Sequence, residues 1–164
     1  MININKIDPR IGNYLSGFAD GEGSFMVVVR KRPDYKAEWK ISLCFNVAQK
    51  ESYILSQFKK HLQCGTLRGR PDGVYYYEVN NFNAIWENVI PFFKKFGFLS
   101  QNKKYQFSNF IQAAEIIKSG KHLEDDGFKK IISVRSKMNR GGNRTNLKSS
   151  ETICQNPLEI TDKI

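Results

Sequence analysis

The segment Tyr14–Phe25 concentrates two carboxylates and several glycines in twelve residues. Asp20 and Glu22 lie where a helix that begins near Asp8 is expected to end, and carboxylates beside free carbonyl groups suit a hard divalent cation. The position is locally unfavourable, because the C-terminus of a helix carries partial negative charge and each carboxylate there costs roughly 0.3–1 kcal/mol. The alternative to a metal site is a helix that ends in an ordinary glycine-rich turn.

Glycines interrupt the same predicted helix. Gly12 and Gly17 each cost about 1 kcal/mol relative to alanine, and such small residues let another backbone approach closely. Gly21 is the expected stop of the helix. Together with Gly23, it is expected to give the backbone around Glu22 conformations that other residues avoid. A helix that carries both unfavourable carboxylates and interior glycines is expected to have a role beyond its own stability.

Few other residues in the chain could support hydrolysis. The 164 residues include only two histidines, and the three cysteines show no C-x-x-C spacing, which argues against a histidine-rich metal site or a zinc ribbon. Hydrolytic chemistry is therefore expected to rest on carboxylates and a metal. The formal net charge of +10 favours a polyanionic partner such as nucleic acid, although a solvated charged surface is the alternative.

The elements that position these residues follow from hydrophobic spacing and turn signals. The expected helices cover Asp8–Gly21, Ser52–Leu62, Phe82–Phe93, Lys103–Ser119 and Gly127–Met138, and the expected strands cover Ser24–Arg32, Trp39–Val47, Thr66–Arg70 and Val74–Val79. We therefore expect one α+β domain over residues 1–139, with an αββαββα core, an antiparallel saddle-like sheet, helices on one face and further C-terminal helices. A basic and polar C-terminal tail, which could be loosely ordered, is expected over residues 140–164.

The nine residues from Leu15 to Gly23, LSGFADGEG, resemble the signature of the LAGLIDADG homing endonucleases. Leu15, Gly17, Asp20 and Gly23 match the signature outright, and the other positions carry substitutions that the family uses. The predicted helix–hairpin–helix–hairpin order is also the architecture of that family. The resemblance covers roughly residues 8–117.

The resemblance implies a site-specific endonuclease that hydrolyses DNA with a metal. It implies Mg²⁺ as the cofactor, with Mn²⁺ or Ca²⁺ able to replace it for binding, and no small organic cofactor. Glu22 and the carbonyl group of Gly21 would be metal ligands, whereas Asp20 would hold the helix end and the neighbouring backbone.

Two further residues are assigned catalytic roles by the resemblance. Gln49 would contact the ordered water, and Lys103 would lie near the scissile phosphate, although Lys104 or Gln101 could hold that place. From the residues alone, Gln49 could be an exposed strand end and Lys103 a surface lysine.

One copy of the motif supplies half of such a site, so the resemblance implies a homodimer and a long, roughly palindromic double-stranded target. The small or polar residues of the motif helix are expected to form the dimer interface: Gly12, Asn13, Ser16 and Gly17.

One face of the sheet is expected to contact DNA, because strand side chains alternate between faces and arginine can pair with guanine in the major groove. An ordinary solvated sheet face would show the same alternation, but it would less often concentrate Arg and Lys without matching acids. The predicted DNA-facing residues are Met26, Val28, Arg30, Arg32, Lys36, Lys40, Ser42, Cys44, Asn46, Arg68, Arg70, Tyr76 and Glu78. Seven basic residues and no acid between Lys129 and Lys148 favour further phosphate contacts over a solvated tail.

Other functions and locations can be weighed from the same sequence. A catalytically inactive relative that assists RNA splicing as a maturase, or that regulates DNA, is the alternative function, and the retained Glu22 argues against it. A generic RNA-binding domain is less favoured, because the aromatic residues fall mainly at core spacing. No apolar run approaches the roughly 20 residues of a membrane span, and no secretory signal is expected. Proteins of this kind are typically intron-encoded, so we expect an organelle (mitochondrion or chloroplast) or a microbial cytoplasm.

Overall fold

A computed structural model describes residues 2–32 and 39–138 of the chain. The loop that contains Lys36, and the chain from residue 139 onward with its predicted tail, lie outside the described residues. In chain order the elements are η1 (Ile4–Lys6), α1 (Pro9–Glu22), β1 (Gly23–Lys31), β2 (Trp39–Gln49), α2 (Ser52–Leu62), β3 (Thr66–Gly69), β4 (Tyr75–Val79), α3 (Phe82–Ala84), the π-helical turn η2 (Ile85–Val89), α4 (Ile90–Phe96), α5 (Gln101–Lys118), η3 (Lys121–Leu123) and α6 (Asp125–Met138).

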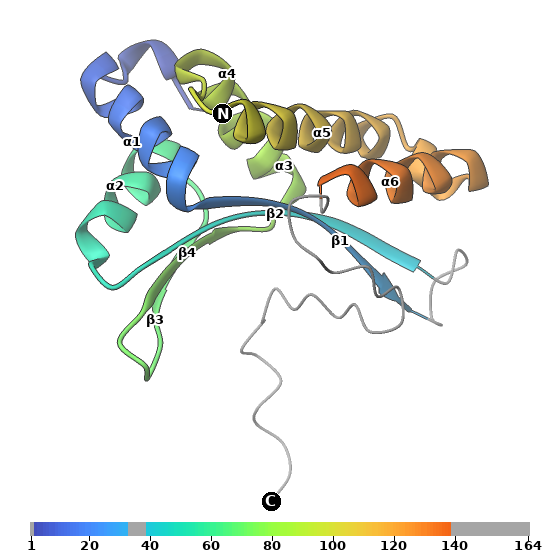
Figure 1. Ribbon diagram of the computed structural model, residues 1–164, viewed down its shortest axis with the longest axis horizontal. Helices are drawn as coiled ribbons and strands as arrows, with labels where there is room; N and C mark the ends of the chain where they lie inside the picture. Colours follow the sequence, from blue (N-terminus) through green and yellow to red (C-terminus); the bar gives the residue numbers. More distant parts are fainter. Residues whose placement is uncertain (1, 33–38, 139–164) are drawn as a thin grey trace, which may run out of the picture.

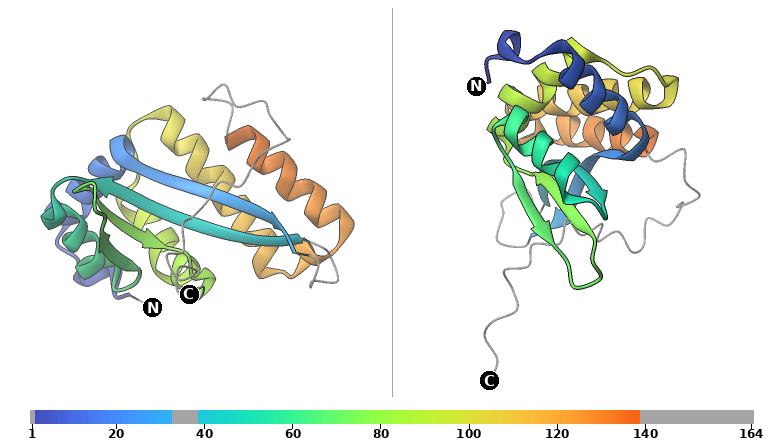
Figure 2. Two further views of the ribbon diagram at one scale, coloured as in Figure 1. Left: turned by 90° about the horizontal axis from the view of Figure 1, so that it is seen from below. Right: turned by 90° about the vertical axis from the view of Figure 1, so that its left-hand side faces the viewer.

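The four strands form one antiparallel sheet in the order β1-β2-β4-β3. The longest pairing joins β1 to β2, from Gly23 opposite Val47 to Lys31 opposite Trp39. The described helices lie on one side of this sheet, which arches so that its helix-free face is concave (Figure 1). Figure 2 shows the bare strands from below and the helix layer behind them. The predicted α+β class and the αββαββα order are confirmed.

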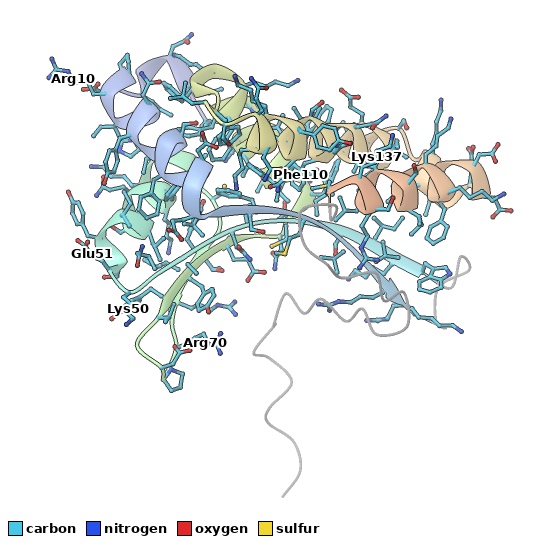
Figure 3. The ribbon with its side chains drawn as sticks, viewed as in Figure 1. Arg10, Lys50, Glu51, Arg70, Phe110 and Lys137 are labelled. Atoms are coloured by element: carbon cyan, nitrogen blue, oxygen red, sulfur yellow. The ribbon has the colours of Figure 1, made fainter. Side chains whose placement is uncertain are left out.

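An aromatic cluster forms the core between the sheet and the helices. Phe25 of β1 stacks on Phe45 of β2 with ring centroids 5.0 Å apart. Phe93 of α4 contacts both rings, at 5.4 and 5.1 Å, and Phe110 of α5 lies 5.1 Å from Phe25. Figure 3 shows Phe110 between α5 and the strands. Because aromatic side chains bury large apolar areas, this cluster fixes α4 and α5 relative to the start of β1.

Helix α1 passes directly into strand β1, with no intervening loop. The predicted stop at Gly21 is therefore wrong, because the helix continues through Glu22. The predicted unusual backbone is wrong as well, because neither Gly21 nor Gly23 is among the residues with positive φ in the described chain. Gly23 is needed for space instead: a Cβ atom there would lie 2.6 Å from the carbonyl oxygen of Ala19. The glycine lets the chain leave the helix sharply and keeps Glu22 at the junction.

The helix predicted over Phe82–Phe93 is divided into α3, the π-helical turn η2 and α4. The π-helical turn ends just before Pro91, which has no backbone N–H group to continue a regular ladder. Asn88 in this turn is buried and donates a hydrogen bond of 2.9 Å to the carbonyl oxygen of Leu62, the last residue of α2. The irregular turn therefore ties the end of α2 to the layer that contains α4.

Candidate functional site

Asp20, near the end of α1, is bound to the start of α5. Its Oδ2 atom accepts hydrogen bonds from the backbone N–H groups of Leu99 and Ser100, each at 2.9 Å, and its Oδ1 atom accepts one from the Ser100 hydroxyl. Burial acts to raise the pKa of Asp20, but these hydrogen bonds and the charge of Lys103 outweigh it, so the pKa lies below its ordinary value of 3.8. Asp20 is ionised at neutral pH and occupied by backbone donors, as its expected supporting role requires.

Glu22 lies two residues further on and has a different environment. Its side chain is exposed, and none of the other described residues forms a hydrogen bond with its carboxylate. Gly21 beside it is also exposed, with nothing within 4 Å of the position of a Cβ atom. Its carbonyl group is among the last four of the helix, which have no intrahelical donor. A carboxylate and a backbone carbonyl with open coordination positions fit a hard divalent cation such as Mg²⁺.

Lys103 is brought next to this helix end by α5. Its side chain is only 8% exposed, and its Nζ atom donates to the carbonyl oxygen of Gly23, the residue after Glu22. Burial lowers the pKa of Lys103, and the charges of Asp20 and Glu22 oppose this lowering. The alternative that Lys103 is a surface lysine is wrong.

The two alternatives to Lys103 occupy different positions. Lys104 and Gln101 are both exposed, and the contact with the start of β1 is made by Lys103. Of the three candidates, Lys103 is therefore the residue that lies beside the junction between α1 and β1.

Gln49 lies at the end of β2, two residues beyond Val47, which pairs with Gly23. It is thus at the same end of the sheet as the α1 junction. Its side chain is half-buried, and its Oε1 atom accepts a hydrogen bond of 2.8 Å from the backbone N–H of Lys50. Among the described residues, no hydrogen bond joins Gln49 to Glu22 or Lys103. Gln49 therefore lies at the same end of the sheet as these two residues without bonding to either.

The concave face of the sheet carries most of the residues predicted to contact DNA. Cross-strand pairs place Met26 opposite Cys44, Val28 opposite Ser42, Arg30 opposite Lys40, Asn46 opposite Glu78, and Arg68 opposite Tyr76. At the β3–β4 hairpin, Arg70 donates a hydrogen bond of 2.9 Å to the hydroxyl of Tyr76, and its Nε atom lies 3.5 Å from a carboxylate oxygen of Asp72. Figure 3 shows Arg70 at this hairpin, remote from the helix layer.

Two of the predicted DNA-facing residues are not accessible. Val28 is 3% exposed and Cys44 is 1% exposed. Both side chains are short, and the Cys44 thiol lies 3.5 Å from the Glu78 carboxylate, to which it donates. Val28 and Cys44 are therefore too buried in this structure for the DNA contact predicted for them.

Two of the residues predicted at a dimer interface are instead packed within the chain. A Cβ atom on Gly12 would overlap the ring of Phe96 in α4, and the hydroxyl of Ser16, which is 1% exposed, donates to the carbonyl oxygen of Gly97. The assignment of Gly12 and Ser16 to an intermolecular surface is therefore wrong, because their small size serves the contact between α1 and α4. Asn13 and Gly17, on another side of α1, are exposed.

Ser100 and Leu99 are functional-site residues that the sequence reasoning missed. Ser100 is the N-cap of α5, where its side chain accepts a hydrogen bond of 3.2 Å from the backbone N–H of Lys103. The available signal was a serine just before a helical pattern, which is typical of an N-cap. The helix therefore begins at Gln101, two residues before the predicted start.

An exposed carboxylate at a helix–strand junction, a buried lysine beside it and a concave sheet with basic residues define the class of protein: a single-motif domain of the LAGLIDADG type. The family model described as LAGLIDADG endonuclease matches residues 15–114. The chain belongs to this family. Within the part of the chain that the structure describes, no helix is long and apolar enough to cross a membrane.

Known endonucleases resemble the chain at low identity. A probable intron-encoded endonuclease 2 of Neurospora crassa is 26% identical over 145 residues, which cover 86% of this chain and 32% of the relative. The DNA endonuclease I-CreI of Chlamydomonas reinhardtii is 25% identical over 144 residues, covering 85% of this chain and 84% of that protein. The chain spans about a third of the length of the Neurospora relative.

Solved structures show the same fold. The meganuclease I-SmaMI, crystallised with uncleavable DNA, superposes with a TM-score of 0.75 at 27% identity, over 82% of this chain and 46% of that one. The homing endonuclease I-TnaI superposes with a TM-score of 0.73 at 26% identity, over 83% of this chain and 90% of that one. One further I-SmaMI structure was determined with calcium ions and uncleaved DNA.

Proposed function

We propose that this chain is a site-specific double-strand DNA endonuclease that acts as a homodimer on a long, roughly palindromic target. The observation that carries the proposal is Glu22, an exposed carboxylate with no hydrogen bond from another described residue, at the motif helix end of a chain that belongs to the LAGLIDADG endonuclease family. A carboxylate left open beside a buried lysine is suited to metal-dependent phosphodiester hydrolysis.

Glu22 and the Gly21 carbonyl would hold Mg²⁺, which would neutralise charge that develops on the phosphate and lower the pKa of a bound water. Ca²⁺ with uncleaved DNA in an I-SmaMI structure supports the use of divalent cations at this site. Asp20 holds the helix end in place, and Lys103 offers a positive charge and N–H donors to the scissile phosphate. The amide N–H₂ group of Gln49 forms no hydrogen bond with the other described residues, and with it Gln49 can orient water at the same sheet end.

The concave sheet face would bind the DNA duplex. Arg68 and Arg70 lie on the β3–β4 hairpin, and Lys40 and Arg30 lie opposite each other near the far end of β1 and β2. These cations would neutralise phosphates or pair with base edges in the major groove. DNA bound to I-SmaMI, a protein of the same fold, supports this use of the sheet.

A second copy of the chain would complete the active site. Gly17 and Gly21 are one helical turn apart on α1, and nothing lies within 4 Å of a Cβ position at either residue. Because neither residue has a side chain, the helix of a partner could approach this face closely, and a two-fold axis there would bring two Glu22 side chains together. Asn13 is exposed on the same side of the helix and would contribute to the seam. Names of relatives that refer to introns support an intron-encoded origin.

The test is to incubate the protein with a randomised duplex library and Mg²⁺, and to repeat the incubation with Glu22→Gln. We expect discrete double-strand cuts with the natural protein, and binding of the same sequences without cuts with the variant, because glutamine keeps the size of the side chain and removes its charge. Specific binding without cleavage by the natural protein, across Mg²⁺, Mn²⁺ and Ca²⁺, would contradict the proposal and favour a DNA-binding regulator.

A further inference from the structure

Ser100 forms hydrogen bonds in two directions from one side chain. Its hydroxyl donates to Oδ1 of Asp20 at the end of α1, and the same oxygen accepts the backbone N–H of Lys103 at the start of α5. Its own backbone N–H donates to Oδ2 of Asp20 at 2.9 Å. One residue therefore joins the last turn of the motif helix to the first turn of the helix that carries Lys103.

We infer that Ser100 is a positioning residue, which sets the Lys103 side chain against the Glu22 junction by tying α5 to Asp20. Lys103 lies three residues, or about one helical turn, after Ser100. A shift or rotation of the first turn of α5 would therefore move its Nζ atom away from the Gly23 carbonyl. The claim that this placement of Lys103 matters for cleavage rests on the function proposed above. The claim that Ser100 determines the placement does not.

The charges at this contact favour the same arrangement. Asp20 is poorly placed on α1, because it lies at the negative end of that helix dipole. The same carboxylate faces the N-terminus of α5, an 18-residue helix, where free N–H groups and partial positive charge stabilise an anion. The Ser100 contact therefore turns an unfavourable charge on one helix into a cap for the next.

The contact also separates the roles of the two acids on α1. Asp20 accepts donors from Leu99 and Ser100, so its oxygens are occupied. Glu22 receives no hydrogen bond from the other described residues. Lys103 bonds to the backbone of Gly23 and leaves the Glu22 carboxylate available. We expect the loss of the Ser100 hydroxyl to move Lys103 and to leave Glu22 exposed as before.

The first test measures the position of Lys103 without any need for activity. Limited acylation of lysines, followed by peptide mass spectrometry, gives the ratio of labelling at Lys103 to labelling at Lys104, its exposed neighbour. We expect a low ratio in the natural protein and a rise of about threefold or more in Ser100→Ala. The substitution removes both the N-cap of α5 and the hydroxyl hydrogen bond to Asp20. Ser100→Thr should restore the low ratio.

Two further variants separate positioning from simple helix capping. Ser100→Asp can still cap α5, but its side chain has no donor for Asp20, in place of the lost hydroxyl, and adds a like charge beside it. It should therefore raise the labelling ratio as alanine does. Ser119→Ala removes a serine hydroxyl bond at the other end of the same helix and should leave the ratio unchanged. A Ser100→Asp variant that labels like the natural protein would overturn the inference, as would an unchanged ratio in Ser100→Ala.

Single-turnover cleavage gives the second readout. If the proposed function holds, Ser100→Ala should cut its target about tenfold more slowly, with DNA affinity in Ca²⁺ within about twofold of the natural protein, since none of the sheet residues changes. Equal losses of rate and affinity would contradict a positioning role. If the natural protein cuts no DNA, the proposed function fails, and the labelling ratios still decide whether Ser100 positions Lys103.

Discussion

Asp20 and Glu22 lie two residues apart on one helix, yet the structure gives them opposite surroundings. Asp20 accepts hydrogen bonds from Leu99 and Ser100, whereas Glu22 is exposed and free of hydrogen bonds within the described chain. Local electrostatics disfavour both acids at a helix C-terminus. Only the start of α5 distinguishes them, because it supplies donors to one acid and none to the other. Asp20 therefore joins two helices, and Glu22 is left open for the cation that we propose it binds.

Asp20→Ala should lower the free energy of unfolding by about 1 kcal/mol at pH 7, because the bonds that it removes are partly solvated. The pKa of Asp20 is lowered on folding from 3.8. Its contribution is therefore fully present above the unfolded value and is lost as the pH falls through the folded value. The difference between variant and natural protein should narrow below pH 3.8 in urea titrations. Glu22→Ala is the matched control, with a change within about 0.5 kcal/mol.

At the scale of helices, small residues on α1 serve two different surfaces. Gly12 and Ser16 allow α4 to pack closely, with contacts to Phe96 and Gly97. Gly17 lies on another side of the helix and is exposed. Both glycines have the same helical cost relative to alanine, but only Gly12 has a neighbour that the missing side chain makes room for.

Gly12→Ala should destabilise the protein by about 1–3 kcal/mol, because its methyl group would displace the Phe96 ring from a packed layer. Gly17→Ala should instead hold or raise stability by up to about 1 kcal/mol, since alanine is the better helix former at an open position. Denaturant unfolding at low protein concentration distinguishes the two outcomes. Equal effects of the two substitutions would contradict the packing described for α1.

The positions of most helices and strands could be predicted from local sequence patterns. The strands, the hairpin at Asp72 and the helix Ser52–Leu62 follow from alternation, turn residues and helical spacing, because these signals are local. The contacts of Gly12 with Phe96 and of Asp20 with Ser100 join residues about 80 apart in the chain, and no local pattern indicates such a partner. The burial of Lys103 was missed for the same reason, since lysine is rarely buried unless a distant group bonds to it.

At the scale of the whole molecule, the described part of the chain has a basic concave sheet face and an exposed face on helix α1. The concave face would hold DNA, and the α1 face with Gly17 and Gly21 would meet a second copy. In the proposed dimer the two surfaces would depend on each other, because each chain provides one Glu22 and a symmetric target would need two. Substitutions on the exposed face of α1 should therefore weaken the dimer, just as substitutions on the concave sheet face should weaken DNA binding.

Gly17→Gln should keep the fold of a single chain and abolish the dimer, because the side chain extends from an open position into the space that a partner helix would use. Sedimentation equilibrium in dilute solution should show a dimer for the natural protein and a monomer for the variant. Ser108→Gln, at an exposed position on α5, is the control that should remain dimeric. A natural protein that stays monomeric on DNA would contradict the shared site.

Mixed dimers test the central claim, that two Glu22 carboxylates form one site, most directly. Natural protein and Glu22→Gln are mixed in equal amounts, exchanged to equilibrium, and assayed with Mg²⁺ for total strand cleavage of the selected target, with single-strand nicks counted as well as double-strand cuts. If both carboxylates are required, only about a quarter of the dimers are active and the rate falls to about a quarter of that of the natural protein at the same total concentration. A rate near one half would show that each chain cuts by itself and would contradict the account.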